Sequence, residues 1–261
     1  MPEGVEIELY RRTAEAAVGR RVEQVQAPDA WFLKRGLTAS AAAAALTGRT
    51  VTAARRRGKL LLLDTSDGGP VLGLRFGMTG RLVVDGRPGV EVLQYSSGRD
   101  LAAWDRFALD FVDGGQLRIN DPRRLGGVEL DPDEEALGID ASALTLGQLR
   151  RALGSSTVAL KARLMDQGRI GGIGNLLADE ILWRAALDPA RPAGGLDERE
   201  QRRLHRTIRA VWAEDLALGG SHLGRFQVAR VRGGVCPRDG EPLERRTIGG
   251  RTTFSCPRHQ R

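Results

Sequence analysis

The chain has 261 residues, a formal net charge of +7, 41% hydrophobic residues and two cysteines. It is long and apolar enough for a sizeable core, its cysteines are too few for a disulfide scaffold, and no apolar run reaches the about 18 residues of a membrane helix. The surplus positive charge favours a polyanionic partner such as nucleic acid, although a basic enzyme without that role would carry the same charge.

The first residues are acidic and lack the basic and apolar order of a secretory signal, so we expect a cytoplasmic protein. Residues 3–18 have apolar side chains at helical spacing, and Gly19 ends this predicted helix. Turns rich in glycine and aspartate separate predicted strands at residues 21–26, 60–64, 71–76, 80–84, 101–111 and 116–119, with a short helix at 39–46. This half predicts a β-sandwich or flattened barrel behind one N-terminal helix.

After about residue 130 the pattern becomes helical. Helical periods cover residues 145–153, 158–166, 175–186 and 197–216, and alternation returns after residue 226 with a hairpin between Cys236 and Cys256. We therefore predict an α+β fold with an N-terminal β-sandwich domain and a C-terminal helical domain that ends in a β-hairpin. The expected boundaries are residues 1–128, 129–225 and, for the hairpin segment, 226–261.

Pro2 is the first candidate for chemistry. Proline after an initiator methionine permits removal of the methionine, and a free α-amine has a pKa of about 7.7–8.0, so part of it is neutral at physiological pH. A neutral amine attacks a sugar aldehyde carbon as Schiff-base enzymes do, although Pro2 alone could be an ordinary second residue.

Glu3 and Glu6 favour the catalytic interpretation, because their spacing places both near the amine on one helix face. Glu3 could move protons, and both carboxylates would also stabilise the helix N-terminus.

Two further segments could contact phosphates. Lys59 follows a run of three arginines and a glycine and precedes an apolar strand, which suits a phosphate or base contact but also a solvated basic loop. Glycines at 171, 172 and 174 precede the helix that Asn175 opens. Such glycines expose backbone N–H groups at the positive end of a helix, although they could also only permit a tight turn.

The C-terminal tail has the spacing of a metal-binding finger. Two residues separate Cys236 from Asp239, and two separate Cys256 from His259. Paired ligands on two knuckles form a tetrahedral zinc site, in which aspartate is a weaker ligand than cysteine or histidine. We expect one structural Zn²⁺ on these residues, the alternative being a metal-free hairpin with incidental cysteines.

Together these segments resemble the formamidopyrimidine-DNA glycosylase / endonuclease VIII family over nearly the full length of the chain. The similar motifs are Pro-Glu-Gly-Val-Glu at residues 2–6, Gly-Lys at 58–59, Asn-Asp-Pro-Arg-Arg at 120–124, Gly-Ile-Gly-Asn at 172–175 within a helix–two-turn–helix, and the hairpin at 251–259. The first and fourth motifs together are the most specific signal, because they lie far apart in the chain and must meet at one site.

The resemblance implies a base excision repair enzyme that binds damaged double-stranded DNA, removes the damaged base and cleaves the strand by β,δ-elimination. Pro2 would attack C1′ of the damaged nucleotide, Glu3 would move protons, and Glu6 would support the site. The implied DNA contacts are Lys59, Asn175 and Arg251 at phosphates, Met78 in the gap left by the extruded base, and Arg123 at its partner base. We expect a monomer, since one chain supplies every group.

Some positions depart from the family pattern. Leu125 stands where many members of the purine-specific branch have an aromatic wedge, and Asp239 and His259 replace the usual cysteines. Residues 219–226 are shorter than the loop that covers the lesion in that branch. The short loop, the Gly4 start and the Gly-Arg-Phe-Gln-Val segment at residues 224–228 favour the endonuclease VIII branch and oxidised pyrimidines or abasic sites, with oxidised purines and bulky adducts left open.

Two other functions fit parts of the sequence. A protein of the same fold could bind damaged or branched DNA without excising bases, but Pro2, Glu3 and Lys59 would then have no purpose. A nucleic-acid-binding structural protein could share only the helix–two-turn–helix. The N-terminal motif and the finger-like tail argue against that second alternative.

Overall fold

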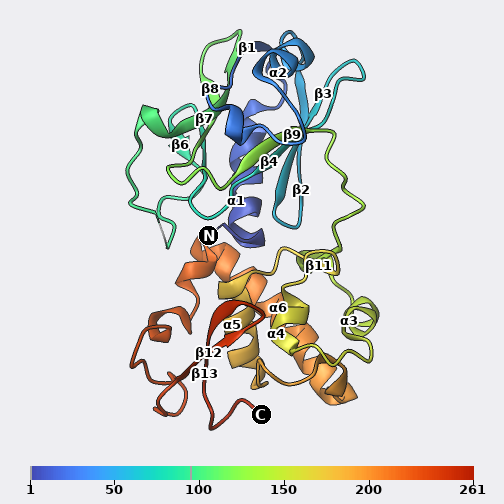
Figure 1. The fold of residues 1–261 in the computed structure, drawn as a ribbon, viewed down its shortest axis with the longest axis vertical. Coiled ribbons are helices and arrows are strands. Elements are labelled where there is room, and N and C mark those ends of the chain that lie inside the picture. The colour runs from blue at the N-terminus through green and yellow to red at the C-terminus, as the bar shows by residue number, and fades with distance from the viewer. Residues whose placement is uncertain (1, 95) are drawn as a thin grey trace. The chain divides into compact units, whose positions relative to one another are not determined.

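The computed structural model describes residues 2–94 and 96–261. These residues form two compact units: the first contains Pro2 and residues Glu6–Glu134, and the second contains Glu3–Val5 and Glu135–Arg261. The first is rich in strands and the second in helices, so the predicted α+β fold is confirmed (Figure 1).

The first unit is a β-sandwich whose strands pair antiparallel throughout the described residues. One sheet has the strand order β1-β7-β8-β5-β6 and the other has the order β2-β3-β4-β9. The strands are β1 (Val22–Gln26), β2 (Val51–Arg57), β3 (Leu60–Thr65), β4 (Leu72–Arg75), β5 (Arg81–Val84), β6 (Arg87–Pro88), β7 (Asp105–Phe111), β8 (Gln116–Asn120) and β9 (Gly127–Leu130).

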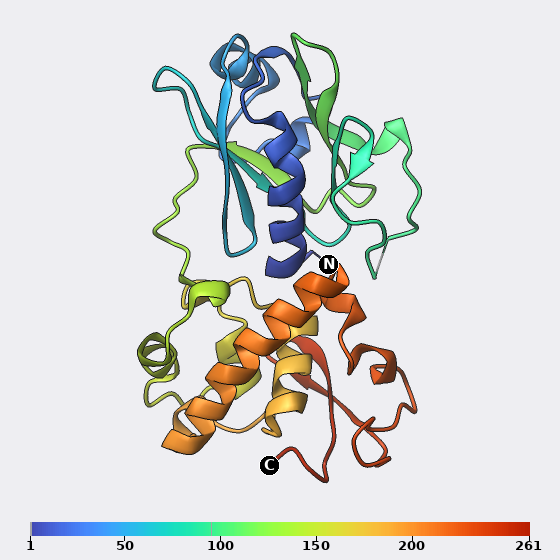
Figure 2. The ribbon, with the colours of Figure 1, turned by 180° about the vertical axis from the view of Figure 1, so that it is seen from behind.

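Helix α1 (Gly4–Ala14) contributes one face to the core of this unit. Ile7, Tyr10 and Ala14 are buried at helical spacing, and the Tyr10 ring lies 4.5 Å from that of Phe76. Helix α2 (Ala39–Leu46) has the bounds that the sequence predicts, because Thr38 accepts the N–H of Ala41 at 3.1 Å and so caps it. Figure 2 shows α1 beside the strands of this unit.

The basic run before Lys59 differs from its expected form. Residues 55–57 belong to strand β2 and pair with Leu60, Leu61 and Leu62 of β3, whereas the sequence predicted no strand here and left a solvated basic loop as one alternative. Carboxylates within the unit explain the difference. Arg55 pairs with Asp64 at 2.7 Å and with Glu134 at 2.9 Å, so this cation can lie on a sheet without being left uncompensated.

The second unit is helical, with a short parallel pair of strands and a C-terminal hairpin. Its elements are β10 (Ile139–Asp140), α3 (Leu146–Leu153), α4 (Leu160–Leu164), β11 (Ile170–Gly171), α5 (Asn175–Ala185), α6 (Glu198–Leu218), β12 (Glu244–Ile248) and β13 (Arg251–Ser255). Helix α6 crosses α5 in Figure 2. Capping boxes begin two of the helices: Thr145 with Gln148 at α3, and Asp197 with Glu200 at α6.

Candidate active site and nucleic-acid interface

The Glu3 carboxylate caps helix α5. Glu3 is fully buried, and its two oxygens accept the backbone N–H groups of Gly174 at 3.0 Å, Leu176 at 2.9 Å and Leu177 at 3.0 Å. Gly174 is the N-cap residue of α5 and has no side chain to satisfy these donors. A carboxylate from the start of the chain therefore takes the place of an N-cap side chain and lies at the positive end of the helix.

Glycines make this contact possible. A Cβ atom on Gly174 would overlap the Glu3 carboxylate, and one on Gly4 would come within 2.5 Å of the Trp212 ring. The N–H of Gly4 donates to the carbonyl of Gly172 at 2.8 Å, and Gly172 has a φ of 103°. The sequence suggested that these glycines expose N–H groups to a phosphate; instead, three of the N–H groups at this helix end bind Glu3.

Pro2, Glu6 and Lys59 lie in the first unit. Pro2 and Glu6 are buried, and Met1, whose removal would free the Pro2 amine, lies outside the described residues. Lys59 is half-buried in the two-residue turn that joins β2 to β3, where Arg57 pairs with Leu60. Gly58 precedes it with a φ of 58°, a conformation that glycine adopts without strain.

The predicted DNA-reading residues of the first unit lie on adjoining loops. Met78 is half-buried in the turn between β4 and β5, while Arg123 and Leu125 are exposed on the loop between β8 and β9. The two loops are in close contact at Gly77, since an added Cβ atom there would overlap the carbonyl of Leu125. The structure therefore brings these three predicted residues together.

The consecutive arginines of the second loop have different surroundings. Arg124 binds Asp29 through two bonds of 2.6 Å, from Nε and Nη2, and Asp29 also accepts the N–H of Trp31. The Arg124 guanidinium lowers the pKa of Asp29. Arg123, in contrast, has no hydrogen bond or ion pair from its guanidinium to any described residue, so it is the arginine available to a ligand.

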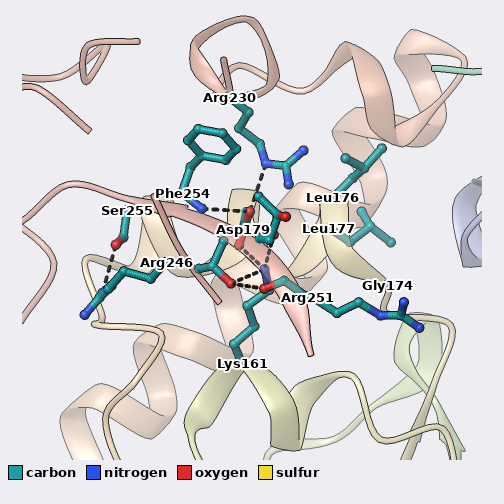
Figure 3. A network of polar contacts seen from close by, with 12 residues as sticks. Lys161, Gly174, Leu176, Leu177, Asp179, Arg230, Arg246, Arg251, Phe254 and Ser255 are labelled. Carbon is teal, nitrogen blue, oxygen red and sulfur yellow. Dashed lines mark hydrogen bonds and ion pairs between the residues drawn. The ribbon is translucent and has the colours of Figure 1, made fainter. Parts of the chain in front are cut away.

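Asn175 and Arg251, the predicted phosphate ligands of the second unit, begin α5 and β13 respectively. The Asn175 side-chain oxygen is buried and accepts no hydrogen bond from the described residues. Arg251 is exposed, and its guanidinium has no partner among those residues. Figure 3 shows its side chain extending away from the Asp179 carboxylate.

A buried ionic network, which the sequence did not predict, attaches the hairpin to the helices (Figure 3). Asp179 of α5 binds Lys161 of α4 at 2.7 Å and Arg230 at 2.9 Å, and Lys161 also donates to the Thr253 hydroxyl of β13 at 2.8 Å. Burial lowers the pKa of Lys161, while Asp179 opposes that shift. The sequence did contain one sign of this network, the acidic pair at residues 179 and 180. Charged residues within an otherwise apolar helix require buried partners.

The four predicted metal ligands converge. One ligand atom from each of Cys236, Asp239, Cys256 and His259 lies within 4.8 Å of the others. Sγ of Cys236 lies 3.6 Å from Nδ1 of His259, and Sγ of Cys256 lies 3.5 Å from the Asp239 carboxylate. Tetrahedral bonds of about 2.0–2.3 Å would separate such atoms by about 3.4–3.6 Å, so the arrangement fits a zinc ion.

The groups around these ligands also fit a metal. His259 Nε2 lies 3.2 Å from the Trp183 carbonyl, which orients Nδ1 toward the other ligands, and Trp183 Nε1 donates to Sγ of Cys236 at 3.3 Å. Burial raises the pKa of Asp239, but hydrogen bonds that include those from Cys236 and the Glu241 N–H outweigh it and bring that pKa to about 2. The carboxylate is therefore ionised and able to bind a cation at neutral pH.

Comparison with known families agrees with this architecture. The model of the formamidopyrimidine-DNA glycosylase N-terminal domain matches residues 1–128, and that of the formamidopyrimidine-DNA glycosylase H2TH domain matches residues 134–227. The chain thus belongs to the formamidopyrimidine-DNA glycosylase / endonuclease VIII family.

Individual relatives cover essentially the whole chain. A formamidopyrimidine-DNA glycosylase of Thermus thermophilus is 35% identical over 98% of this chain and 97% of its own length. One of Alkalilimnicola ehrlichii is 34% identical over 100% of both chains. The Lactococcus lactis protein, solved in complex with DNA that contains an oxidised pyrimidine, has a TM-score of 0.83 and 25% identity over 100% of both chains.

These comparisons do not separate the two branches of the family. The curated relatives named here are formamidopyrimidine-DNA glycosylases, whereas the sequence favoured the endonuclease VIII branch.

Among the helices of the described residues, none combines the length and the apolar character that a membrane span requires.

Proposed function

We propose that this chain is a DNA glycosylase and abasic-site lyase of base excision repair that removes oxidised bases from duplex DNA. The observation that carries the proposal is the capping of α5 by Glu3. It holds the residue next to Pro2 against the Gly-Ile-Gly-Asn segment, so the two most specific motifs of the sequence meet in one place. We also propose that the protein works as a monomer at the chromosome, in a bacterial cytoplasm or nucleoid.

The proposed nucleophile is the amine of Pro2 after removal of Met1. The amine nitrogen bonds to C1′ of the damaged nucleotide, the C1′–N bond to the base breaks, and the base leaves with a proton. Opening of the sugar ring gives an iminium between the Pro2 nitrogen and C1′. The iminium acidifies the 2′ hydrogen, and its removal breaks the C3′–O3′ bond; a second elimination breaks the C5′–O5′ bond. Glu3 moves protons in these steps, and Glu6 supports the site.

The proposed DNA contacts supply what this chemistry requires. C1′ inside a duplex is out of reach, so the nucleotide must leave the stack at a cost of a few kcal/mol. Lys59, Asn175 and Arg251 would hold phosphates around the extruded nucleotide. Met78 and Leu125 would fill the gap and Arg123 would contact the partner base, which offsets the cost of unstacking.

We propose that Cys236, Asp239, Cys256 and His259 hold a structural Zn²⁺. The ion would supply no chemistry to the reaction. It would fix the segment that carries the β12–β13 hairpin, and with it the position of Arg251 at the start of β13.

Borohydride trapping on duplex DNA with one abasic site tests the proposal. Wild type with mass-verified removal of Met1 should form a covalent complex, Pro2→Ala should form none, and Pro28→Ala, at an exposed proline, should behave as wild type. Absence of a complex from the wild type, with DNA binding intact, would identify a binder of damaged DNA that does not excise bases. A panel of oxidised pyrimidines, oxidised purines and bulky adducts then ranks the lesions, with oxidised pyrimidines expected first.

A further inference from the structure

One buried carboxylate connects the two loops that carry Met78, Arg123 and Leu125. Asp121 follows strand β8 and is fully buried. Its Oδ1 accepts the Thr79 hydroxyl at 2.6 Å and the Arg123 N–H at 3.2 Å, and its Oδ2 accepts the N–H groups of Leu125 and Gly126, each at 2.9 Å. A side chain that contributes nothing to the surface thus binds both loops.

The position of Asp121 is itself fixed by its backbone. Its N–H donates to the carbonyl of Trp104 at 2.8 Å, and its carbonyl accepts Nε of Arg106 at 2.9 Å. The carboxylate therefore extends from a backbone whose N–H and carbonyl are both hydrogen-bonded to other parts of the unit. Its four acceptor bonds use essentially the whole hydrogen-bonding capacity of a carboxylate, which accepts about four bonds.

Further contacts restrain both loops. The Tyr10 hydroxyl donates to the carbonyl of Gly80 at 3.0 Å, just after Thr79. On the second loop, Asp29 binds the Arg124 guanidinium. None of the hydrogen bonds named here involves the side chains of Met78, Arg123 and Leu125, which are the three proposed to enter the DNA.

We propose that Asp121 is a positioning residue that holds Met78, Arg123 and Leu125 in one rigid unit for insertion into duplex DNA. This inference rests on the proposed function. Asp121 touches no DNA itself. Because the loops are ordered before binding, the protein does not lose their conformational freedom when it fills the gap of an extruded nucleotide. This pre-ordering by Asp121 should matter only for duplex substrates, since a single strand has neither a gap in a base stack nor a partner base.

Asp121→Asn is the direct test. The amide keeps one acceptor oxygen but turns an NH₂ group toward N–H or O–H donors, so one of the two pairs of bonds is lost. We measure the rate of borohydride trapping on one abasic strand, alone and annealed to its complement. Trapping on the single strand should stay within about twofold of wild type, while trapping on the duplex should fall at least about tenfold, because the two hydrogen bonds to one oxygen no longer order the loops.

Thr79 provides a matched pair in case Asp121→Asn folds poorly. Thr79→Val removes the hydroxyl donor but keeps the shape of the side chain, and should lower trapping on the duplex relative to the single strand. Thr79→Ser keeps the hydroxyl and should restore the wild-type ratio. Thermal unfolding verifies that each variant is folded.

The results separate this inference from the proposed function. If the wild type traps neither substrate, the proposed function fails. If the wild type traps both substrates, and Asp121→Asn and Thr79→Val keep the wild-type ratio of duplex to single-strand rates, Asp121 is a structural residue and the inference is overturned. This holds even if both rates fall together. A selective loss on the duplex supports it.

Discussion

The Glu3 carboxylate and the Leu176 N–H group are joined by a hydrogen bond of 2.9 Å across 173 positions of the chain. This bond belongs to a set in which one buried side chain satisfies three donors at the start of α5. A change at Glu3 should therefore affect both the chemistry beside Pro2 and the stability of the helical unit.

Glu3→Gln tests both effects together. The amide cannot accept all three N–H groups and lacks the negative charge at the helix end, so we expect a loss of about 1–3 kcal/mol in the free energy of unfolding. If Glu3 moves protons, base excision should also slow by about 10²–10⁴-fold. Denaturant unfolding and single-turnover excision measure the two effects, with Glu23→Gln on an exposed stretch of β1 as the control. Excision at the wild-type rate would remove Glu3 from the reaction.

Gly174→Ala should destabilise the protein because the new methyl group would overlap the Glu3 carboxylate. The cost of such overpacking is about 1–3 kcal/mol or more. Gly147→Ala in α3 is the matched control, since its Cβ would meet nothing closer than an Arg151 nitrogen at 3.8 Å. A helical alanine is favoured over glycine by about 0.5–1 kcal/mol, so thermal unfolding should show opposite shifts for the two variants.

Asp29 should stabilise the protein at neutral pH and make its stability fall in acid. Its pKa is lowered below 3.8, first by hydrogen bonding to Arg124, so the folded state favours the carboxylate. Because the pKa is lower in the folded state, the Asp29 carboxylate adds to the free energy of unfolding above pH 3.8. That stabilisation is lost as the pH falls through the lower pKa of the folded state. Asp29→Asn should be less stable at pH 7 and should lose less stability below pH 4 than wild type does. Unfolding curves from pH 7 to below pH 4 measure this difference, with the exposed Asp67→Asn as the control that should parallel wild type. If Asp29→Asn also paralleled wild type, the prediction would be wrong.

Metal analysis tests the proposed zinc site. The purified chain should contain about one Zn²⁺, and a strong chelator should remove it with a fall in Tm. Because Trp183 Nε1 donates to Cys236, removal of the metal should change tryptophan fluorescence, and Zn²⁺ but not Mg²⁺ should restore it. Cys256→Ser should show the apo spectrum without a chelator. A metal-free protein with an unchanged Tm and spectrum after chelation would support the alternative of a hairpin that needs no ion.

Arg251→Ala and Asn175→Ala should differ in their dependence on salt. Both should weaken binding to abasic duplex DNA, but only the arginine removes a charge. The slope of log affinity against log salt concentration should therefore become shallower by about one for Arg251→Ala and stay unchanged for Asn175→Ala. Fluorescence anisotropy at several salt concentrations measures the slopes. Arg199→Ala, at an exposed arginine of α6, tests whether the loss of any surface charge has the same effect.

Local signals were enough to predict the elements that form within a few residues of one another. Helix α2 has the predicted bounds because its N-cap Thr38 and its run of alanines are contiguous. The hairpin of β12 and β13 lies within the segment between Cys236 and Cys256, where two glycines mark the turn. Strand β2 was missed because its arginines suggested solvent, while the carboxylates that pair with them lie elsewhere in the chain.

The sequence by itself determined the family, the α+β architecture and the types of side chain available for chemistry, since short motifs and local periodicity carry these signals. Only the tertiary structure decided which partners those side chains have. It assigned the N–H groups at the start of α5 to Glu3 rather than to a phosphate, and it paired Asp179 with Lys161. It left the Arg123 guanidinium without a partner among the described residues, while the neighbouring Arg124 bound Asp29. Buried charges and helix ends must be satisfied, but any group that the fold brings near can satisfy them, and the chain order does not specify which group that is.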